Sequence, residues 1–425
     1  MAEQHEKALV PQIRFTGFTD PWEQRKLSEL VEIERGGSPR PIERYITDDP
    51  CGLNWVKIGD APELGRYITQ TTEKIKPEGL AKTRQVYPGD LVLSNSMSFG
   101  RPYIMAIKGC IHDGWLLIRD AQKHFDPIFL CHMLGAPQML NQYRMFAAGS
   151  TVNNLNKELV GKAIVSLPSK DEQREIGIVF DRLDSLITLH QRKYDKLCVL
   201  KKSMLDKMFP KGGSLYPEIR FAGFTDPWEQ RKLGELTESY SGGTPAAGES
   251  EFYGGSIPFI RSAEIAAEST ELFLTEKGYE SSSARMVKPG DVLYALYGAT
   301  SGEVAVSRQK GAINQAILAI LPRDDCDARY ITAWLRKQKG YIVTTYLQGG
   351  QGNLSGVIVK NLEVFIPSLP EQQKIGFMLS HLDSLITLHQ RKYDGCANPL
   401  FLERRISCRK PSHQNRCSAT TTPSG

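Results

Sequence analysis

Two stretches of the chain show the apolar spacing of amphipathic helices. From Glu172 to Phe209, apolar residues recur every three or four positions, with no proline and only one glycine. A second such stretch begins at Glu371 and keeps the pattern as far as Asp394. At 1.5 Å per residue the first helix would be roughly 55 Å long, and its apolar stripe calls for an equally long partner. We expect the two helices to pair within the chain, although each could instead pack on its own domain. The expected seam consists of Ile176, Phe180, Leu183, Ile187, Tyr194, Leu197, Met204, Met208, Ile375, Leu382 and Ile386.

The segments that precede these helices read as short strands and turns. Each has a Gly-Gly-x-Pro turn, within 35–39 and 241–245, and a Pro-Gly-Asp turn, at 88–90 and 289–291, that leads into an apolar strand. Amphipathic helices are then expected from Asp126 to Phe146 and from Asp327 to Gln348. A last strand ends in Ser-Leu-Pro in both segments. The pattern predicts two α+β domains of about 150 residues, each followed by a long helix.

Identical sequences mark the two copies of this plan. The sequence FTDPWEQRKL occurs at 18–27 and 224–233, and LDSLITLHQRKYD occurs unchanged at 183–195 and 382–394, whereas the residues between them differ. The chain is therefore an internal repeat with pseudo-two-fold character, too long in period for a solenoid. The expected parts are a first domain at 1–168, its helix at 169–212, a second domain at 213–370, a shortened helix at 371–394 and an aberrant tail at 395–425.

Charge and cysteine content give little direct guidance to function. The net charge is +5, but the segment 395–425 alone holds most of it, so a DNA-binding surface would need local placement of basic residues. The eight cysteines form no CxxC pair, which favours reduced thiols. The sequence contains no apolar run of 18 residues and no signal peptide, which predicts a cytoplasmic protein without membrane contact.

The chain also lacks the common catalytic signatures. It has no P-loop, nucleophile elbow or metal-ligand spacing, and no Ser, His and Asp set recurs in both copies. His190 and His389 lie on or beside the predicted seam, where a helix contact explains them better than a metal does. We therefore expect a non-catalytic chain that binds no metal and no cofactor.

The combined pattern resembles the specificity subunit of type I restriction-modification systems. The resemblance rests on two GFTDPWEQRKL segments and two dissimilar domains, each followed by a helix with LDSLITLHQRKYD, and it covers about residues 13–394. It implies two target-recognition domains that each read half of a split double-stranded DNA target, separated by two antiparallel helices. It also implies partners: two methyltransferase subunits and the motor-nuclease subunits, which would hold S-adenosylmethionine, ATP and magnesium.

Base edges and phosphates call for Arg, Lys, Asn, Gln, Ser and Tyr side chains at polar turns and strand ends. The candidate DNA-binding residues are Lys57, Asn95, Ser96, Arg101, Asn153 and Asn154 in the first domain and Arg261, Tyr294, Tyr297, Gln315, Gln351 and Asn353 in the second. Ordinary surface polarity is the alternative explanation for each. Two alternative functions stay open: a helical scaffold that binds only proteins, and an inactive specificity subunit altered by a frameshift.

The second copy departs from the first after Asp394. Pro399 and Pro411 prevent a continuous helix there, and three cysteines fall in the last 31 residues. A reading-frame change or a rearrangement explains this sequence best, and a basic, disordered extension that contacts DNA is the alternative. A shortened second helix is expected to leave Leu197, Met204 and Met208 without partners, and so to weaken assembly or remove one partner-docking surface.

Overall fold

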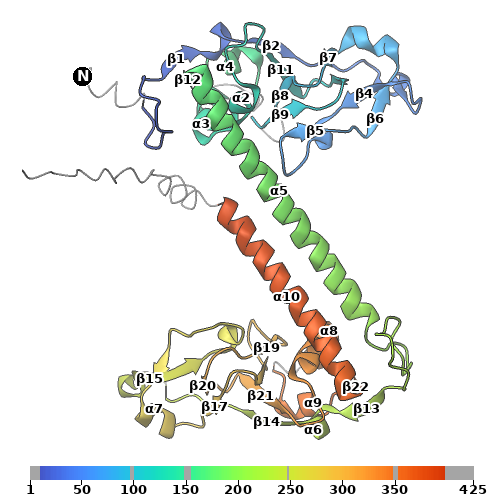
Figure 1. The fold of residues 1–425 in the computed structure, drawn as a ribbon, viewed down its shortest axis with the longest axis vertical. Coiled ribbons are helices and arrows are strands. Elements are labelled where there is room, and N and C mark those ends of the chain that lie inside the picture. The colour runs from blue at the N-terminus through green and yellow to red at the C-terminus, as the bar shows by residue number, and fades with distance from the viewer. Residues whose placement is uncertain (1–9, 96–99, 148–154, 247, 348–352, 398–425) are drawn as a thin grey trace, which may run out of the picture. The chain divides into compact units, whose positions relative to one another are not determined.

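The computed structural model describes residues 10–95, 100–147, 155–246, 248–347 and 353–397 (Figure 1). Its contacts divide the chain into two compact units. Unit 1 comprises residues 1–191 and 392–425, and unit 2 comprises residues 192–391. Each unit combines short strands with helices, as the sequence predicts.

Unit 1 is built on two five-stranded sheets. The first has the order β2-β11-β8-β9-β5, with bounds Glu32–Arg35, Trp115–Arg119, Leu91–Ser94, Pro102–Met105 and Tyr67–Ile68. The second has the order β3-β6-β4-β10-β7, with bounds Ile46–Thr47, Glu73–Ile75, Leu53–Val56, Gly109–Ile111 and Arg84–Val86. Strand β8 follows the Pro-Gly-Asp turn at 88–90, as predicted, and all four of its residues are buried. This strand lies between β11 and β9, where the core of the unit forms.

The helices of unit 1 differ from the prediction in one respect. The single helix expected from Asp126 to Phe146 is two helices, α2 (Pro127–Leu134) and α3 (Pro137–Ala147). Gly135 is the C-cap of α2, and Pro137 follows, so the hydrogen-bond ladder cannot continue through this point. The Asp126 side chain accepts hydrogen bonds from the backbone N–H groups of Ile128 and Phe129, which caps α2. A short helix, α4 (Lys157–Gly161), precedes the last strand of the unit.

Unit 2 repeats the core topology of unit 1 with unlike residues. One sheet has the order β14-β21-β18-β19, with bounds Thr237–Ser241, Ile317–Pro322, Val292–Ala295 and Val304–Val306. The other has the order β16-β15-β20-β17, with bounds Phe273–Leu274, Tyr253–Ile260, Gly311–Ile313 and Arg285–Val287. Its helices are α6 (Leu233–Leu236), α7 (Glu276–Glu280), α8 (Ala328–Leu347) and α9 (Gly356–Lys360). The long helix predicted from Asp327 is therefore present as α8.

Two long helices follow the two domains. Helix α5 spans Lys170–Lys207, whose 38 residues correspond to about 57 Å. It belongs to unit 1 as far as Gln191 and to unit 2 from Arg192. Helix α10 spans Leu369–Ala397, so it continues three residues beyond the predicted end at Asp394. Residues 398–425, most of the predicted tail, lie outside the described residues.

The sequence match at Ser-Leu-Pro proves misleading. In the first copy these residues end strand β12 (Ile164–Leu167), whereas in the second copy Leu369 and Pro370 open α10. The second strand, β22 (Glu363–Ile366), ends earlier, before Pro367. Each of these strands pairs antiparallel with a repeated Glu-Gln-Arg-Lys strand, β1 (Glu23–Lys26) or β13 (Glu229–Lys232).

The expectation that Leu197, Met204 and Met208 lack partners is wrong. Met208 is only 2% exposed, and Leu197 and Met204 pack against the same cluster of unit 2 as Ile375, Leu379 and Leu382 of α10. Within unit 2, α10 and the second half of α5 run in opposite directions (Figure 1). The end of α5 therefore packs with residues from the start of α10, which precede the altered end of the second copy.

Candidate nucleic-acid interface

The repeated residues form the same buried ion pair in each unit. Both Glu172 oxygens accept from the Arg14 guanidinium at 2.7 Å, and both Glu371 oxygens accept from Arg220 at 2.8 Å. The glutamate side chains are 1% and 0% exposed, so each carboxylate depends on its arginine for compensation. These pairs fix the segment that leads into each domain to the first turn of the long helix that follows it.

A glutamine next to each glutamate adds a second set of equivalent contacts. Gln173 accepts from the backbone N–H of Asp126 at 2.9 Å, and Gln372 accepts from that of Asp327 at 3.0 Å. Each glutamine also donates to two backbone carbonyls of its own unit. Both are nearly fully buried, so every polar atom of the amide is used inside the protein. We call the ion pair and the glutamine together the mount of each unit.

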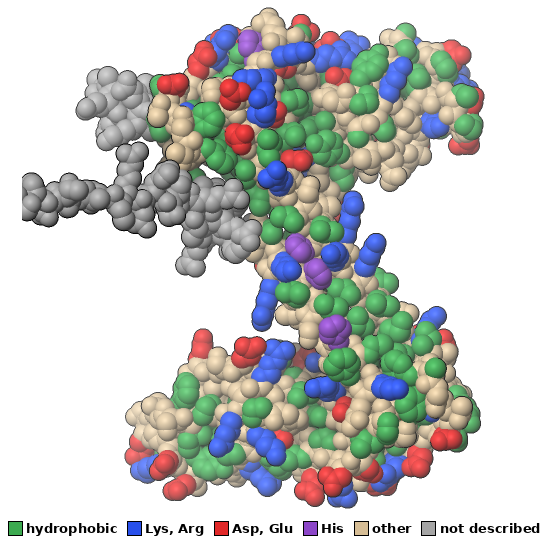
Figure 2. Space-filling view, in the orientation of Figure 1, with side chains coloured by type: hydrophobic (Ala, Val, Ile, Leu, Met, Phe, Trp, Pro, Cys, Tyr) green, Lys and Arg blue, Asp and Glu red, His purple; other side chains and the backbone are tan. Residues whose placement is uncertain are grey.

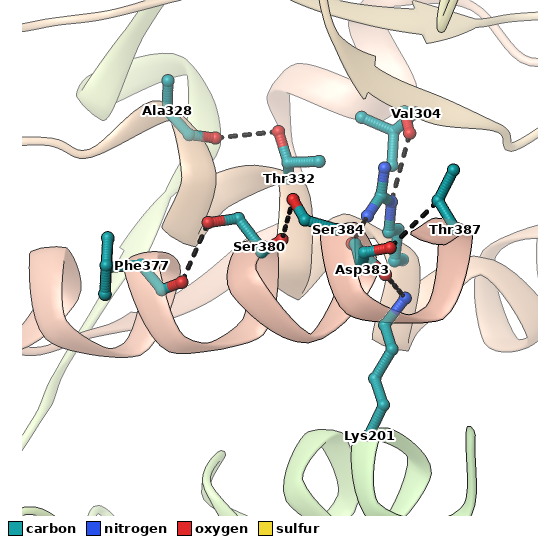
Figure 3. A network of polar contacts seen from close by, with 10 residues as sticks. Lys201, Val304, Ala328, Thr332, Phe377, Ser380, Asp383, Ser384 and Thr387 are labelled. Atoms are coloured by element: carbon teal, nitrogen blue, oxygen red, sulfur yellow. Dashed lines mark hydrogen bonds and ion pairs between the residues drawn. The ribbon is translucent and has the colours of Figure 1, made fainter. Parts of the chain in front are cut away.

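The repeated Asp-Ser-Leu sequence makes a third equivalent contact, but with different partners. Asp184 accepts from Arg66 at 2.6 Å in unit 1, whereas Asp383 accepts from Arg336 in unit 2. Figure 3 shows that Asp383 also faces Lys201 from the second half of α5, with which it forms an ion pair. Each domain thus supplies its own arginine to the same repeated aspartate.

His132 shares the Asp184 site without being charged. Burial, with the nearby Arg66 charge, lowers its pKa to about 3 from the usual 6.5. Its ring stacks on Phe180 with 4.8 Å between centroids, and its Nε2 lies 3.5 Å from the Asp184 carboxylate. A neutral imidazole carries no charge to pair with the carboxylate, so Arg66 is the cation that compensates Asp184.

The Gly-Gly-Ser/Thr-Pro loops approach the sheets closely in both units. A Cβ on Gly36 would lie 2.2 Å from the His112 carbonyl oxygen, and one on Gly242 would lie 1.9 Å from that of Ile313. No side chain larger than hydrogen fits at either position. The glycines therefore hold each loop against the turn that joins the last strands, β10 to β11 in unit 1 and β20 to β21 in unit 2.

A hydroxyl on each loop contacts a polar side chain on that turn. Ser38 donates to Asp113 Oδ1 at 2.7 Å, and Thr244 donates to Gln315 Oε1. Burial acts to raise the pKa of Asp113, but the hydrogen bond from Ser38, with smaller effects of nearby groups that include a backbone hydrogen bond and Arg35, lowers this pKa below its usual value. The turn of unit 1 thus presents a carboxylate where that of unit 2 presents an amide.

The two predicted cations Lys57 and Arg261 also occupy equivalent positions. Each precedes a short 3-10 helix and binds an acid through its backbone N–H, Asp60 for Lys57 and Glu264 for Arg261. The Lys57 ammonium forms an ion pair with Glu73 at 2.6 Å, and the Arg261 guanidinium pairs with Glu264 at 2.6 Å. Both cations are partly exposed and already paired, so a phosphate would have to compete with the carboxylates.

The remaining candidates fall into three groups. Arg101 and Asn353 are exposed and Tyr297 is half-buried beside Gln315, to which it hydrogen-bonds. Asn95 and Tyr294 are 3% and 0% exposed, and burial raises the pKa of Tyr294 to about 12. The other four candidates lie outside the described residues: Ser96, Asn153, Asn154 and Gln351.

Burial gives Asn95 and Tyr294 structural positions. The Asn95 amide donates to the Asp113 backbone carbonyl at 2.9 Å, and this hydrogen bond helps to hold the β10–β11 turn in place. Tyr294 lies on β18, between β21 and β19, within the main core of unit 2. In this fold neither side chain is open to a DNA base.

Cavities and charge add some detail to the interface. A cavity of about 690 Å³ in unit 1 is lined by Ser38, Arg40, Lys57 and His112 among others. It therefore adjoins the β10–β11 turn, on which Asp113 lies. Figure 2 shows Lys and Arg interspersed with Asp and Glu on the visible face of each unit. Basic residues therefore do not gather into one broad patch on that face, in keeping with the weak charge signal of the sequence.

The predicted seam residues serve more than one contact. Leu197, Met204, Met208, Ile375 and Leu382 belong to the core of unit 2 or pack against it. Ile176 packs against the core of unit 1, where Phe180 stacks on His132. The others are half-buried: Leu183, Ile187, Tyr194 and Ile386. Both arrangements considered for the helices thus occur along one stripe.

Within the described ranges, no three His, Cys, Asp or Glu side chains come together in a way that could hold a metal ion. None of the described helices has the length and apolar character that crossing a lipid bilayer requires.

Comparison with known proteins identifies the family. The family model for the type I restriction modification DNA specificity domain matches twice, over residues 19–198 and 225–395. The chain belongs to this family. Each match covers one domain with most of its long helix, so the internal repeat is a repeat of the family domain. The relatives are specificity subunits, the non-catalytic subunits of type I restriction systems, as the sequence predicts.

Individual relatives agree with this assignment. The chain is 25% identical over 401 residues to the MjaX specificity subunit of Methanocaldococcus jannaschii, covering 88% of this chain and 89% of the relative. The EcoR124I/EcoR124II specificity subunit of Escherichia coli is 26% identical over 194 residues, which cover 41% of this chain and 48% of the relative. A crystal structure of a type I system S subunit from M. genitalium has a TM-score of 0.63 and 12% identity, covering 95% and 99% of the two chains. That structure supports the fold.

Proposed function

We propose that this specificity subunit reads a split, asymmetric double-stranded DNA target, one half with each unit. In the proposed complex it docks two methyltransferase subunits and the motor-nuclease subunits, and it works in the cytoplasm, where these partners meet DNA. The chain itself supplies recognition and assembly, and the partners supply the catalytic centres and their cofactors.

The observation that carries the proposal is the contrast between the mounts and the turns. The ion pair of Arg14 with Glu172 in unit 1 has the same geometry as that of Arg220 with Glu371 in unit 2. The equivalent turns, by contrast, carry different polar side chains. Side chains that differ in hydrogen-bonding pattern distinguish different base pairs in the major groove. Two unlike domains on equal mounts are therefore suited to two unlike half-sites.

Exposed apolar residues on the long helices support docking of two like partners. Ile178 and Leu189 of α5 are 37% and 45% exposed, and their repeat equivalents on α10, Phe377 and Leu388, are 61% and 43% exposed. In each helix the two residues are 11 positions apart, which is close to three turns, so they lie on one face. The same apolar face therefore occurs once in each copy, as docking of two copies of one subunit requires.

A methylation map tests the proposal. The chain is co-expressed with its methyltransferase partner, and methylated bases in the host DNA are mapped, with the partner alone as control. We expect a split motif that appears only when this chain is present. A second chain, in which residues after Asp394 are replaced by the sequence that follows Asp195, controls for the altered tail. If neither chain yields a split motif, the proposed function is wrong.

The exposed apolar faces also favour a second candidate, a scaffold that binds only proteins. The two functions differ in their dependence on DNA and salt. A DNA reader in its complex shifts a target duplex in a gel, and its affinity falls steeply as salt rises because counterions are released from phosphates. A scaffold assembles the partners equally well but gives no shift beyond that of the partners alone.

A further inference from the structure

The turns that follow β10 and β20 hold a closely matched pair of unlike polar residues. Asp113 and Gln315 occupy corresponding places between the last strands, and each accepts a hydrogen bond from the loop hydroxyl of Ser38 or Thr244. The strand pairs behind them are also equivalent, since β10 pairs with β4 and β7 as β20 pairs with β15 and β17. The fold thus places two different side chains at one position.

The backbone at this position is held firmly in both units. Gly36 and Gly242 allow the loop to contact the turn, and a second glycine of each loop, Gly37 or Gly243, donates its N–H to the Ile111 or Ile313 carbonyl at 3.2 Å. Rigid backbone of this kind limits where the Asp113 and Gln315 side chains can point. A reading side chain needs this constraint because base pairs are distinguished by hydrogen-bond geometry.

Each side chain keeps hydrogen-bonding capacity beyond its loop contact. Gln315 is exposed, and an amide has two donor and two acceptor sites, so its contacts with Thr244 and Tyr297 leave two of these sites for a further partner. Asp113 is 37% exposed, and its second oxygen lies 3.7 Å from the Arg40 guanidinium, whose side chain is 82% exposed. Arg40 is therefore able to move toward a phosphate and leave the carboxylate as an acceptor.

We propose that Asp113 and Gln315 are the equivalent base-reading residues of the two units. The Asp113 carboxylate accepts from the exocyclic amino group of a cytosine in one half-site. Gln315 forms a paired donor and acceptor contact with an adenine in the other half-site. These are the base edges that a carboxylate and an amide match in the major groove. The inference rests on the proposed function, and it adds the residue and base chemistry of each half.

The alternative is that the Ser38–Asp113 and Thr244–Gln315 bonds only stabilise the turns. A structural role predicts that substitution lowers the stability of the unit but leaves its base preference unchanged. A reading role predicts a change of preference at one position of one half-site. The two roles are therefore separated by measuring discrimination between base pairs, and not by measuring activity alone.

The test uses the full chain in complex with its methyltransferase partner. The target motif is taken from the methylation map, and duplexes with one substituted base pair at each position compete with it for binding. The variants are Asp113→Asn and Gln315→Glu. Gln373→Glu, an exposed change of the same kind on α10, is the matched control for Gln315→Glu.

We expect Gln315→Glu to lose roughly tenfold or more of its discrimination at one adenine position, because a carboxylate lacks the donor that the adenine edge requires. Asp113→Asn is expected to lose discrimination at a cytosine position in the other half. Each variant keeps the wild-type profile in the half that it does not read, and Gln373→Glu keeps it throughout. If both reading variants keep the wild-type profile at every position, the inference is overturned.

Two further outcomes are informative. Thr244→Val leaves Gln315 in place but removes the hydroxyl that orients it, so it is expected to weaken discrimination at the same adenine, whereas Thr244→Ser restores it. If Gln315→Glu does not assemble, the comparison of Thr244→Val with Thr244→Ser tests whether Gln315 reads a base. Equal base-pair discrimination by these two Thr244 variants would overturn the inference for unit 2. A wild-type complex with no preference among duplexes would instead refute the proposed function itself.

Discussion

The mount of unit 2 gives the sharpest prediction for stability. Replacing Arg220 with methionine removes the guanidinium that contacts both carboxylate oxygens of Glu371, whose side chain is fully buried, so the carboxylate loses this compensating charge. Breaking one partner of a buried ion pair costs about 3 to 5 kcal/mol. We expect about 3 kcal/mol, the lower end, because the Arg220 side chain keeps 16% of its surface exposed to water.

The double variant Arg220→Met with Glu371→Leu provides the control. It removes both charges, and apolar residues of similar size then fill the space between the segment and the helix. Such replacements are often neutral or stabilising. We therefore expect the double variant to recover most of the loss, with a coupling energy of about 2 kcal/mol or more between the two sites.

Amide hydrogen exchange measured by mass spectrometry is the assay of choice because it resolves the two units. Faster exchange is expected in peptides from the start of α10 and from β13, while peptides from the equivalent Arg14–Glu172 mount of unit 1 serve as the internal reference. The reasoning is refuted if Arg220→Met changes exchange by the equivalent of less than about 1 kcal/mol, or if the two single effects simply add in the double variant.

Three further predictions concern packing, pH and thiol chemistry. Gly376→Ala should lower the melting temperature, because its Cβ would lie 2.7 Å from Asp327 Oδ1, while Gly340→Ala, with nothing within 4 Å, should leave it equal or higher. The unfolded chain takes up the His132 proton below about pH 6.5, and the folded chain takes it up only near pH 3. The free energy of unfolding should therefore decrease as the pH is lowered through this window. His132→Gln should lose less stability between pH 7 and 5, by up to about 2 kcal/mol in urea titrations, and an equal loss would contradict the reasoning. Native thiol labelling should modify exposed Cys51 but spare Cys131, whose pKa burial raises to about 11, and rapid labelling of both would show that unit 1 opens.

Much of the fold could be predicted because hydrophobic period and turn residues are local signals. The Pro-Gly-Asp turns predict β8 and β18, and the four-and-three spacing predicts α5 and α10 within a few residues. The sequence also contained a signal for the break between α2 and α3, which the prediction of one helix overlooked, because Gly135 and Pro137 are both helix breakers. The helical periodicity on both sides of these residues concealed the interruption.

Long-range partners could not be predicted in the same way. Arg14 and Glu172 are separated by 158 residues, and no local pattern connects them. The signal lay in the repeat, because Arg220 and Glu371 stand at matching places in the second copy. Residues kept alike between otherwise dissimilar copies are candidates for mutual contact, and comparing the copies in pairs would have found the mount.

The candidate interface shows the same limit. Tyr294 looked like a strand-end residue, but β18 lies between two strands and is buried on both faces, so it shows no alternation from which an exposed side could be identified. Asp113 was missed because nothing in the sequence shows that Ser38, 75 residues earlier, would contact its carboxylate. Gln315 was found from its residue type, and its match with Asp113 became visible only in the sheets.

The central claim is that each unit reads its own half-site from an equivalent mount. The most direct measurement is a methylation map of a chain in which the unit 1 domain, with its own Arg66 and Asp126, replaces the unit 2 domain on Glu371, Gln372 and Asp383. Because the mounts make the same contacts, the account predicts a symmetric motif built from two copies of one original half. A motif that stays asymmetric, with the original second half intact, would contradict it.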